Sequence, residues 1–287
     1  MARQPSTDLA QHEYLVFDVE TTSPKPGTAR IVEAAAAIVD VNGQRKWAWH
    51  TLVNPGKRIT NSDIHGLKGA DVKDAPSFGE FAHFLAPAFY GRVVVGHNVD
   101  YDLGVATHEF QRAGISMPPQ SALCTMRLSL DLDLGSYDQT LASCLAALSL
   151  PTGRAHSALH DVAATAALFT SLIRLMPMRH VDTLTSWLGP PVPPADWAPR
   201  PLDPPAPSFA ERDGVTLADL DRFPTVADDA VLEQYRRSKR EAKKAAKSRR
   251  PCPQCGIGHL VTKTRRRDGG TFLSCSRFPA CRHAQDA

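Results

Sequence analysis

Two acidic residues interrupt an apolar stretch near the start of the chain. In VFDVETT (16–22), Asp18 and Glu20 stand among β-branched and aromatic residues that favour strands. Alternate residues of a strand point to the same face, so the two carboxylates should lie close enough to repel each other. Burying them costs several kcal/mol unless a partner compensates the charge, and Mg²⁺ prefers such oxygen ligands. The alternative is a chance pair on a solvent-facing edge strand.

A second stretch, VVVGHNVDYDLG (93–104), supplies further polar groups. An apolar strand leads into His97 and Asn98, and Asp102 falls in the first turn of the helix that should follow. Because the helix dipole favours acids there, capping is the alternative explanation for one of Asp100 and Asp102. His97 and Asn98 could likewise serve only to fix a loop.

The third stretch is RAHSALHDVAAT (154–165). Ser157 is expected to cap a helix, which places His156 in the preceding loop and Asp161 near an apolar stripe. An unpaired acid is unusual at that position. Imidazole titrates near neutral pH, so His156 could accept a proton from water. His160 projects about 100° away from Asp161 around the helix and is the weaker candidate base.

Together, these stretches resemble the three exonuclease motifs of the DEDDh superfamily, the family of the proofreading (epsilon) subunit of bacterial replicative DNA polymerase. The matching residues are Asp18-x-Glu20-Thr21-Thr22, His97-Asn98-x-x-Tyr101-Asp102 and His156-x-x-x-x-Asp161. IHGL (64–67) and SYDQTLASCLAALSL (136–150) add secondary matches, whereas Tyr101 stands where Phe is commoner. The resemblance covers residues 12–178, for which it implies an RNase H-like α/β fold with a mixed five-stranded sheet flanked by helices.

The resemblance also implies a two-metal mechanism. The metal ligands would be Asp18, Glu20, Asp102 and Asp161. Of two Mg²⁺ or Mn²⁺ ions, one would lower the pKa of the attacking water and the other would stabilise the leaving 3′ oxygen. His156 would be the general base. The residues implied to contact substrate are Thr21, Thr22, His65 and Leu67 at the 3′ nucleotide and Asn98 at the backbone. For His65, a core or surface role is an equal alternative.

Periodicity predicts the elements that must position these residues. Expected strands cover residues 14–19, 31–41, 45–53 and 92–97, the second and third joined by a turn at Asn42-Gly43. Expected helices cover residues 76–89, 101–113, 125–131, 138–148 and 157–175. The chain of 287 residues, 43% of them hydrophobic, is long enough for one sizeable core.

Beyond residue 178 the composition changes. Residues 190–207 contain nine prolines in 18 positions, which indicates a stiff linker within 179–235 that also has room for short helices. Residues 236–250 carry nine Lys or Arg and one Glu, a net charge of +8 in a chain of net charge +3, so the remainder carries about −5. A solvated face is the simplest explanation, but a phosphate-binding tether is favoured beside a nuclease domain.

The last segment, 251–287, has the cysteine spacing of a zinc ribbon: C-x2-C, 19 residues, then C-x5-C. The expected ligands of one structural Zn²⁺ are Cys252, Cys255, Cys275 and Cys281. The second pair departs from the commoner C-x2-C, which leaves His283 as an alternative to Cys281 and His259 as a more distant one. Four free thiols are the other alternative, but so short a segment needs a staple to fold.

This tail resembles the small zinc ribbons at the C-termini of bacterial type IA topoisomerases, most closely in FLSCSRFPAC (272–281). Those ribbons bind single-stranded DNA, so Phe272 and Phe278 could stack on bases or instead form the core of the ribbon. The resemblance favours DNA over RNA as the partner. An RNA-trimming enzyme, a polymerase-bound proofreading subunit and a non-catalytic scaffold remain alternatives.

The sequence shows no apolar run of 18 residues and no apolar segment typical of a secretory signal near its start. We therefore expect no membrane partner and a cytoplasmic location. Six cysteines then call for an explanation other than disulfides.

Overall fold

The computed structural model describes residues 12–117, 121–134, 138–176, 210–247, 251–265, 269–278 and 280–286. The chain divides into two compact units, Met1–Leu232 and Glu233–Ala287, which are described separately. Most of the predicted Pro-rich linker lies outside the described residues.

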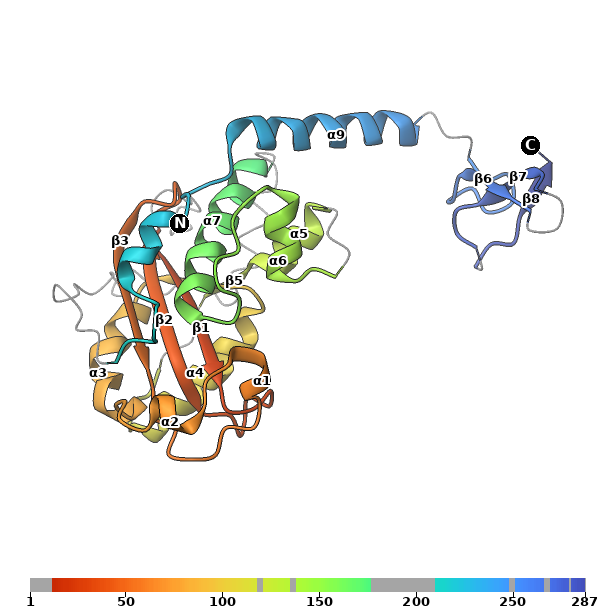
Figure 1. The fold of residues 1–287 in the computed structure, drawn as a ribbon. Helices are drawn as coiled ribbons and strands as arrows, with labels where there is room; N and C mark the ends of the chain where they lie inside the picture. The colour runs from red at the N-terminus through yellow and green to blue at the C-terminus, as the bar shows by residue number, and fades with distance from the viewer. Residues whose placement is uncertain are drawn as a thin grey trace, which may run out of the picture. The chain divides into compact units, whose positions relative to one another are not determined.

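A mixed five-stranded sheet forms the centre of the first unit (Figure 1). Its strands are β1 (Tyr14–Thr21), β2 (Ile31–Val39), β3 (Arg45–Leu52), β4 (Val93–Gly96) and β5 (Ala122–Cys124), in the order β3-β2-β1-β4-β5. The β1–β2 and β2–β3 pairs are antiparallel, and the β1–β4 and β4–β5 pairs are parallel. This arrangement confirms the predicted mixed sheet and four of its strands. β5 is three residues long, too short for a periodic signal.

Helices cover both faces of this sheet (Figure 1). They are α1 (Ser62–His65), α2 (Gly69–Val72), α3 (Phe78–Phe89), α4 (Val99–Arg112), α5 (Thr125–Asp131), α6 (Leu141–Ala147) and α7 (Ala158–Leu175). The five long helical predictions agree with α3 to α7 to within a few residues at each end. α1 and α2 span one turn each, which gives no amphipathic repeat.

The alternation of β1 divides its side chains between two faces. Phe17 packs edge-on against Phe89 of α3, with ring centroids 5.1 Å apart, and belongs to the larger core. Tyr14 packs on Phe169 of α7 at 4.7 Å. Residues an even number apart share a face, so Asp18, like Tyr14, belongs to the α7 side.

α7 is long and apolar enough to cross a membrane by length and composition alone. However, 78% of its apolar window is buried inside the unit, where it packs against β1 and β2. Its apolarity is therefore accounted for by the core of the domain.

The chain returns to the sheet after the undescribed stretch. The Ala210 carbonyl accepts a hydrogen bond from the Leu52 N–H at 2.8 Å, and an isolated antiparallel β-bridge joins Arg212 and Val215. The 3₁₀ helix η3 (Leu217–Arg222) follows, and then α9 (Asp229–Lys247), which carries the basic residues. Residues 210–227 are thus part of the packed unit.

The second unit contains a small antiparallel sheet in the order β6-β7-β8. Its strands are β6 (Leu260–Thr264), β7 (Thr271–Cys275) and β8 (Ala284–Asp286). Three cysteines are buried together here and a fourth packs against them, so the cysteines themselves form the core of this sheet.

Candidate active site and cysteine cluster

The four predicted metal-binding acids meet at one pocket. Asp18 and Glu20 come from β1, Asp102 from the first turn of α4 and Asp161 from the first turns of α7. All four line a pocket of about 590 Å³ together with His156. The Asp102 Oδ1 also accepts a hydrogen bond from the Val19 N–H at 3.2 Å, which fixes α4 against the strand between the two acids.

The electrostatics of this pocket are those of crowded like charges. Burial raises the pKa of Asp18 well above its ordinary value, and the nearby Asp102 and Asp161 raise it further. Burial and the charge of Glu33 raise the pKa of Glu20 to about 8. Without a cation, the cluster therefore retains protons at neutral pH. Such a donor set fits divalent cations, which bind carboxylate oxygens and cancel their repulsion.

The other two acids behave in the same way. Burial raises the pKa of Asp102 to about 8, although the Val19 N–H opposes the shift. Burial and then Glu33 raise the pKa of Asp161 to about 7. Burial is the largest cause of all four shifts, and the charges of neighbouring carboxylates add to it.

His156 lies where a base could reach the pocket. One possible ligand atom from each of Glu20, His156 and Asp161 falls within 4.8 Å of the others. His156 is exposed and its backbone has φ of 57°, the left-handed region that non-glycine residues rarely adopt. His160 has different contacts: its Nδ1 accepts a hydrogen bond from the Arg154 N–H at 2.9 Å, and its ring packs on Phe223.

His97 and Asn98 of the second motif both line the pocket, and His97 also anchors a loop. The ring of His97 contacts the Thr125 hydroxyl at 2.9 Å and the Gln139 carbonyl at 2.8 Å, so it ties the end of β4 to later segments. Asn98 lines the pocket and has φ of 78°, a conformation that Asn tolerates well.

The remaining predicted substrate contacts, Thr21, Thr22, His65 and Leu67, are buried and lie outside the lining of this pocket. The Thr21 hydroxyl is 2.6 Å from the Tyr101 hydroxyl, and Thr22 Oγ1 accepts from the Arg30 N–H at 3.0 Å. The His65 Nδ1 accepts from the Leu67 N–H at 3.1 Å, so its Nε2–H is free to donate to the Thr21 carbonyl at 3.2 Å. These contacts hold the end of β1 against α1 and α4.

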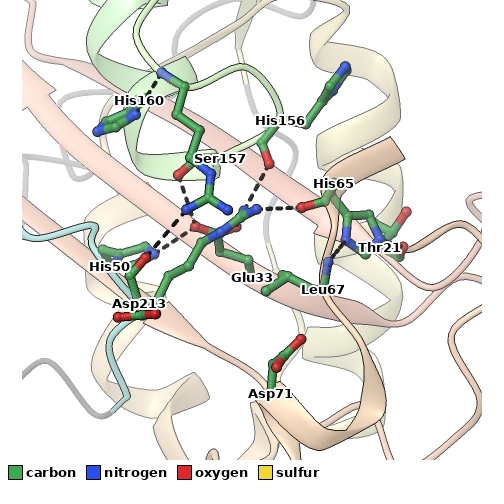
Figure 2. A network of polar contacts seen from close by, with 12 residues as sticks. Thr21, Glu33, His50, His65, Leu67, Asp71, His156, Ser157, His160 and Asp213 are labelled. Atoms are coloured by element: carbon green, nitrogen blue, oxygen red, sulfur yellow. Dashed lines mark hydrogen bonds and ion pairs between the residues drawn. The ribbon is translucent and has the colours of Figure 1, made fainter. Parts of the chain in front are cut away.

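A buried ion-pair network lies next to the acids and involves residues that sequence reasoning missed (Figure 2). Glu33 is paired with Glu20 across β1 and β2 and is fully buried. His50 Nε2 donates to its carboxylate at 2.8 Å, and the Arg212 guanidinium forms an ion pair with it. A lone acid in the apolar strand IVEAAAAIV was a usable signal for Glu33. Nothing in the local sequence around Arg212 distinguishes it.

The four tail cysteines form a compact cluster. Their sulfur atoms all lie within 4.8 Å of one another, and the Cys252–Cys281 and Cys255–Cys275 sulfurs are 3.8 and 3.7 Å apart. Four sulfurs arranged tetrahedrally about 2.3 Å from a zinc ion would be about 3.8 Å apart. The donor set therefore fits zinc.

The alternative nitrogen ligands have other contacts. His283 Nε2 lies 3.0 Å from the Gln285 Oε1, and His259 Nδ1 lies 3.3 Å from the Ser276 hydroxyl. The structure thus brings Cys281, and neither histidine, into the cluster.

Comparison with known proteins gives two family matches. Residues 15–169, more than half of the chain, match the RNase T exonuclease family. Residues 249–287 match the topoisomerase DNA-binding C4 zinc finger. The first match holds the three motifs, and the second holds the four-cysteine cluster.

Curated proteins with similar sequences include two exonuclease-related chains. The 3′-5′ exonuclease DinG of Bacillus subtilis is 28% identical over 180 residues, which is 61% of this chain and 19% of that protein. A DNA polymerase III subunit epsilon-like protein of Rhodobacter capsulatus is 32% identical over 184 residues, 62% of this chain and 26% of that protein. The chain therefore spans about a quarter or less of the length of these relatives.

Solved structures of exonuclease I share the fold. One has a TM-score of 0.53 at 19% identity and covers 61% of this chain and 44% of its own. Escherichia coli exonuclease I in complex with a dA16 oligonucleotide has a TM-score of 0.52 at 20% identity, covering 61% and 43%. With the family match and the fold in agreement, this chain belongs to the RNase T exonuclease family and carries a C4 zinc-finger segment at its C-terminal end.

Proposed function

We propose that the chain is a metal-dependent 3′→5′ exonuclease that removes nucleotides from single-stranded DNA. The observation that carries the proposal is the convergence of four carboxylates and His156 on one pocket. Asp18, Glu20, Asp102 and Asp161 would hold two divalent cations, which supply an activated water and stabilise charge on the leaving 3′ oxygen.

In this mechanism His156 removes a proton from the attacking water. Its position beside Glu20 and Asp161 places the imidazole at the edge of the acid cluster. Thr21, Thr22, His65 and Leu67 would contact the 3′ nucleotide, and the hydrogen bonds of His65 to Thr21 and Leu67 would hold the segment between the first motif and α1 in place for that contact. Asn98 faces the pocket, where it can position the nucleic-acid backbone.

The tail would bind the same substrate outside the catalytic unit. α9 is rich in Lys and Arg, and the matched C4 finger is described as DNA-binding. Phe278 is 58% exposed with Lys263 Nζ 5.2 Å from its ring, a pairing suited to base stacking beside a phosphate. Zinc held by the cysteine cluster would maintain this surface, and a cytoplasmic location would keep the six free cysteines reduced.

The proposal is tested with purified full-length protein and two 5′-labelled strands of equal sequence, one DNA and one RNA. With Mg²⁺ we expect a ladder that shortens from the 3′ end, faster for DNA, and no cleavage in EDTA. Faster loss of the RNA would assign RNA trimming. Binding without cleavage of either strand would favour the scaffold alternative, and co-purification with a polymerase would favour a proofreading subunit.

Replacing Asp18 with Ala should abolish cleavage and leave the fold intact. The change removes one metal ligand and relieves repulsion within the cluster, so the variant should melt at or above the temperature of the wild type in EDTA. Circular dichroism and the ladder assay measure both effects. Full activity in Asp18→Ala would refute the metal assignment.

His156→Ala should lower kcat by about 10²–10⁴-fold, the usual contribution of a general base. His83 is exposed on α3 and provides the matched control, since His83→Ala removes an imidazole remote from the pocket. A loss of less than a few-fold in His156→Ala would assign the proton transfer to another group.

The metal-free protein should lose stability as pH rises from 5 to 8. The folded pKa values of Glu20, Asp102 and Asp161 lie at about 7 to 8, whereas unfolded carboxyls titrate near pH 4. The folded state thus holds protons that the unfolded state releases, and this stabilisation disappears as pH rises through the folded pKa values.

Mg²⁺ or Mn²⁺ should therefore raise the melting temperature more at pH 8 than at pH 5, as thermal melts in EDTA and in metal would measure. Asp63→Asn, at an exposed position, is the control and should retain this difference. An equal metal effect at both pH values would argue against the buried acids as the binding site.

Cys252→Ser and Cys281→Ser should each lose zinc and unfold the tail, because the ribbon has little other core. Hydrolysis of short oligonucleotides should persist while binding to long strands weakens. Zinc content by elemental analysis and binding isotherms measure this, and His283→Ala should retain the metal. Equal loss of activity on short and long substrates would place the tail within the catalytic unit.

A further inference from the structure

Arg212 enters the catalytic unit from a segment that lies beyond the matched exonuclease domain. Ala210, two residues before it, is fixed to β3 by two hydrogen bonds. The Ala210 N–H donates to Thr51 Oγ1 at 3.1 Å, and the Ala210 carbonyl accepts from the Leu52 N–H. The Arg212 side chain is 3% exposed and is therefore buried against the sheet. Burying a guanidinium is costly, so its partners must account for its presence.

Three acceptors surround this guanidinium. Nη1 donates to the carboxylate of Glu33 and to the backbone carbonyl of His156, the latter at 2.8 Å. Nη2 donates to the backbone carbonyl of His65. One planar group thus joins β2, the turn at the end of α1 and the loop before α7; Figure 2 shows Glu33 between His50 on one side and His65 on the other.

The bond to His156 meets a strained part of the chain. A left-handed backbone costs a residue with a β-carbon about 1–2 kcal/mol, so surrounding contacts must hold it. A hydrogen bond to the carbonyl of His156 fixes the orientation of that peptide, and with it the direction in which the imidazole leaves the backbone. The position of His65 is itself fixed, because its two ring nitrogens are hydrogen-bonded to the Thr21 carbonyl and the Leu67 N–H.

Glu33 gives the guanidinium its electrostatic partner. Its carboxylate also accepts hydrogen bonds from His50 Nε2 and from the Ser157 hydroxyl, which is 3.3 Å away at the start of α7. Although burial alone would raise the pKa of Glu33, the hydrogen bond from His50 and the charges of His50 and Arg212 hold it below its ordinary value. Glu33 of β2 is therefore linked directly to Ser157 and, through Arg212, to the backbone of His156.

We propose that Arg212 is a positioning residue of the nuclease site, which acts through the backbone of His156 to hold the catalytic imidazole in place. The inference rests on the proposed function, in which His156 is the general base. It extends the functional domain to a segment outside residues 15–169.

Arg212→Lys in the full-length chain is the first test. A lysine keeps a positive charge for Glu33, but its compact ammonium cannot span the separate acceptors that the guanidinium fork reaches. Single-turnover cleavage of a short 5′-labelled oligonucleotide in Mg²⁺ should slow by about 10²-fold, the cost of roughly 1 Å of misplacement. KM from steady-state assays should change less than the rate, because the His65 ring keeps its own hydrogen bonds when its carbonyl loses the guanidinium.

A double-mutant comparison separates positioning from general destabilisation. In a His156→Ala background, Arg212→Lys should cost less than about two-fold, since the group through which it acts is gone. Effects that multiply in the double variant would overturn the proposal. Arg45→Gln is the matched control, because Arg45 pairs with Asp221 on the same returning segment but contacts no residue of the pocket. A loss in Arg45→Gln equal to that in Arg212→Lys would assign the effect to docking of the segment and also overturn it.

The double variant Glu33→Gln/Arg212→Met tests the proposal in case Arg212→Lys does not fold. This pair removes the donated bonds without leaving a lone buried charge. The same loss of rate, in a protein with a cooperative thermal melt, is the expected result, and a wild-type rate would contradict the proposal. If the wild type itself shows no Mg²⁺-dependent cleavage, the proposed function fails; a cleaving wild type with an equally fast Arg212→Lys refutes the positioning role alone.

Discussion

The repulsion among carboxylates on one face of β1 and β2 is the constraint on which the rest of the catalytic unit depends. Asp18, Glu20 and Glu33 share that face, and Asp161 of α7 lies close enough to raise the pKa of Asp18 and Glu20 further. Like charges in such a place need compensation, which comes in two forms. The pocket acids have a geometry suited to cations, whereas Glu33 accepts a hydrogen bond from His50 and pairs with the positive charge of Arg212.

This division explains why two neighbouring acids on paired strands have opposite properties. Glu20 faces the pocket and its pKa is raised, whereas the hydrogen bond from His50 and the guanidinium of Arg212 hold the pKa of Glu33 low. Glu33 is therefore already satisfied by protein groups and has no need of a metal ion. Of these two acids, the one with the raised pKa lines the pocket, and the one with the lowered pKa belongs to the ion-pair network beside it.

Most of the sheet and the long helices could be predicted from the sequence, because Val16, Phe17 and their neighbours form an apolar run of strand-favouring residues and α7 repeats its apolar residues at helical spacing. The shared face of Asp18 and Glu20 followed from the alternating direction of side chains along a strand, and the other acids followed from the motif resemblance. The contacts of Arg212 could not be predicted. They join segments far apart in the chain through backbone carbonyls, which leave no side-chain signature at positions 65 and 156.

The returning segment also bears on the order in which a ribosome would make the parts of this protein. Every motif acid and His156 precede the proline-rich stretch, whereas Arg212 follows it. A nascent chain that has released α7 can form the sheet, but it must carry Glu33 without the guanidinium of Arg212 until the later residues emerge. Final ordering of the loop around His156 would then wait until Arg212 has emerged, and the growing domain would be open in the meantime to chaperones or to early collapse.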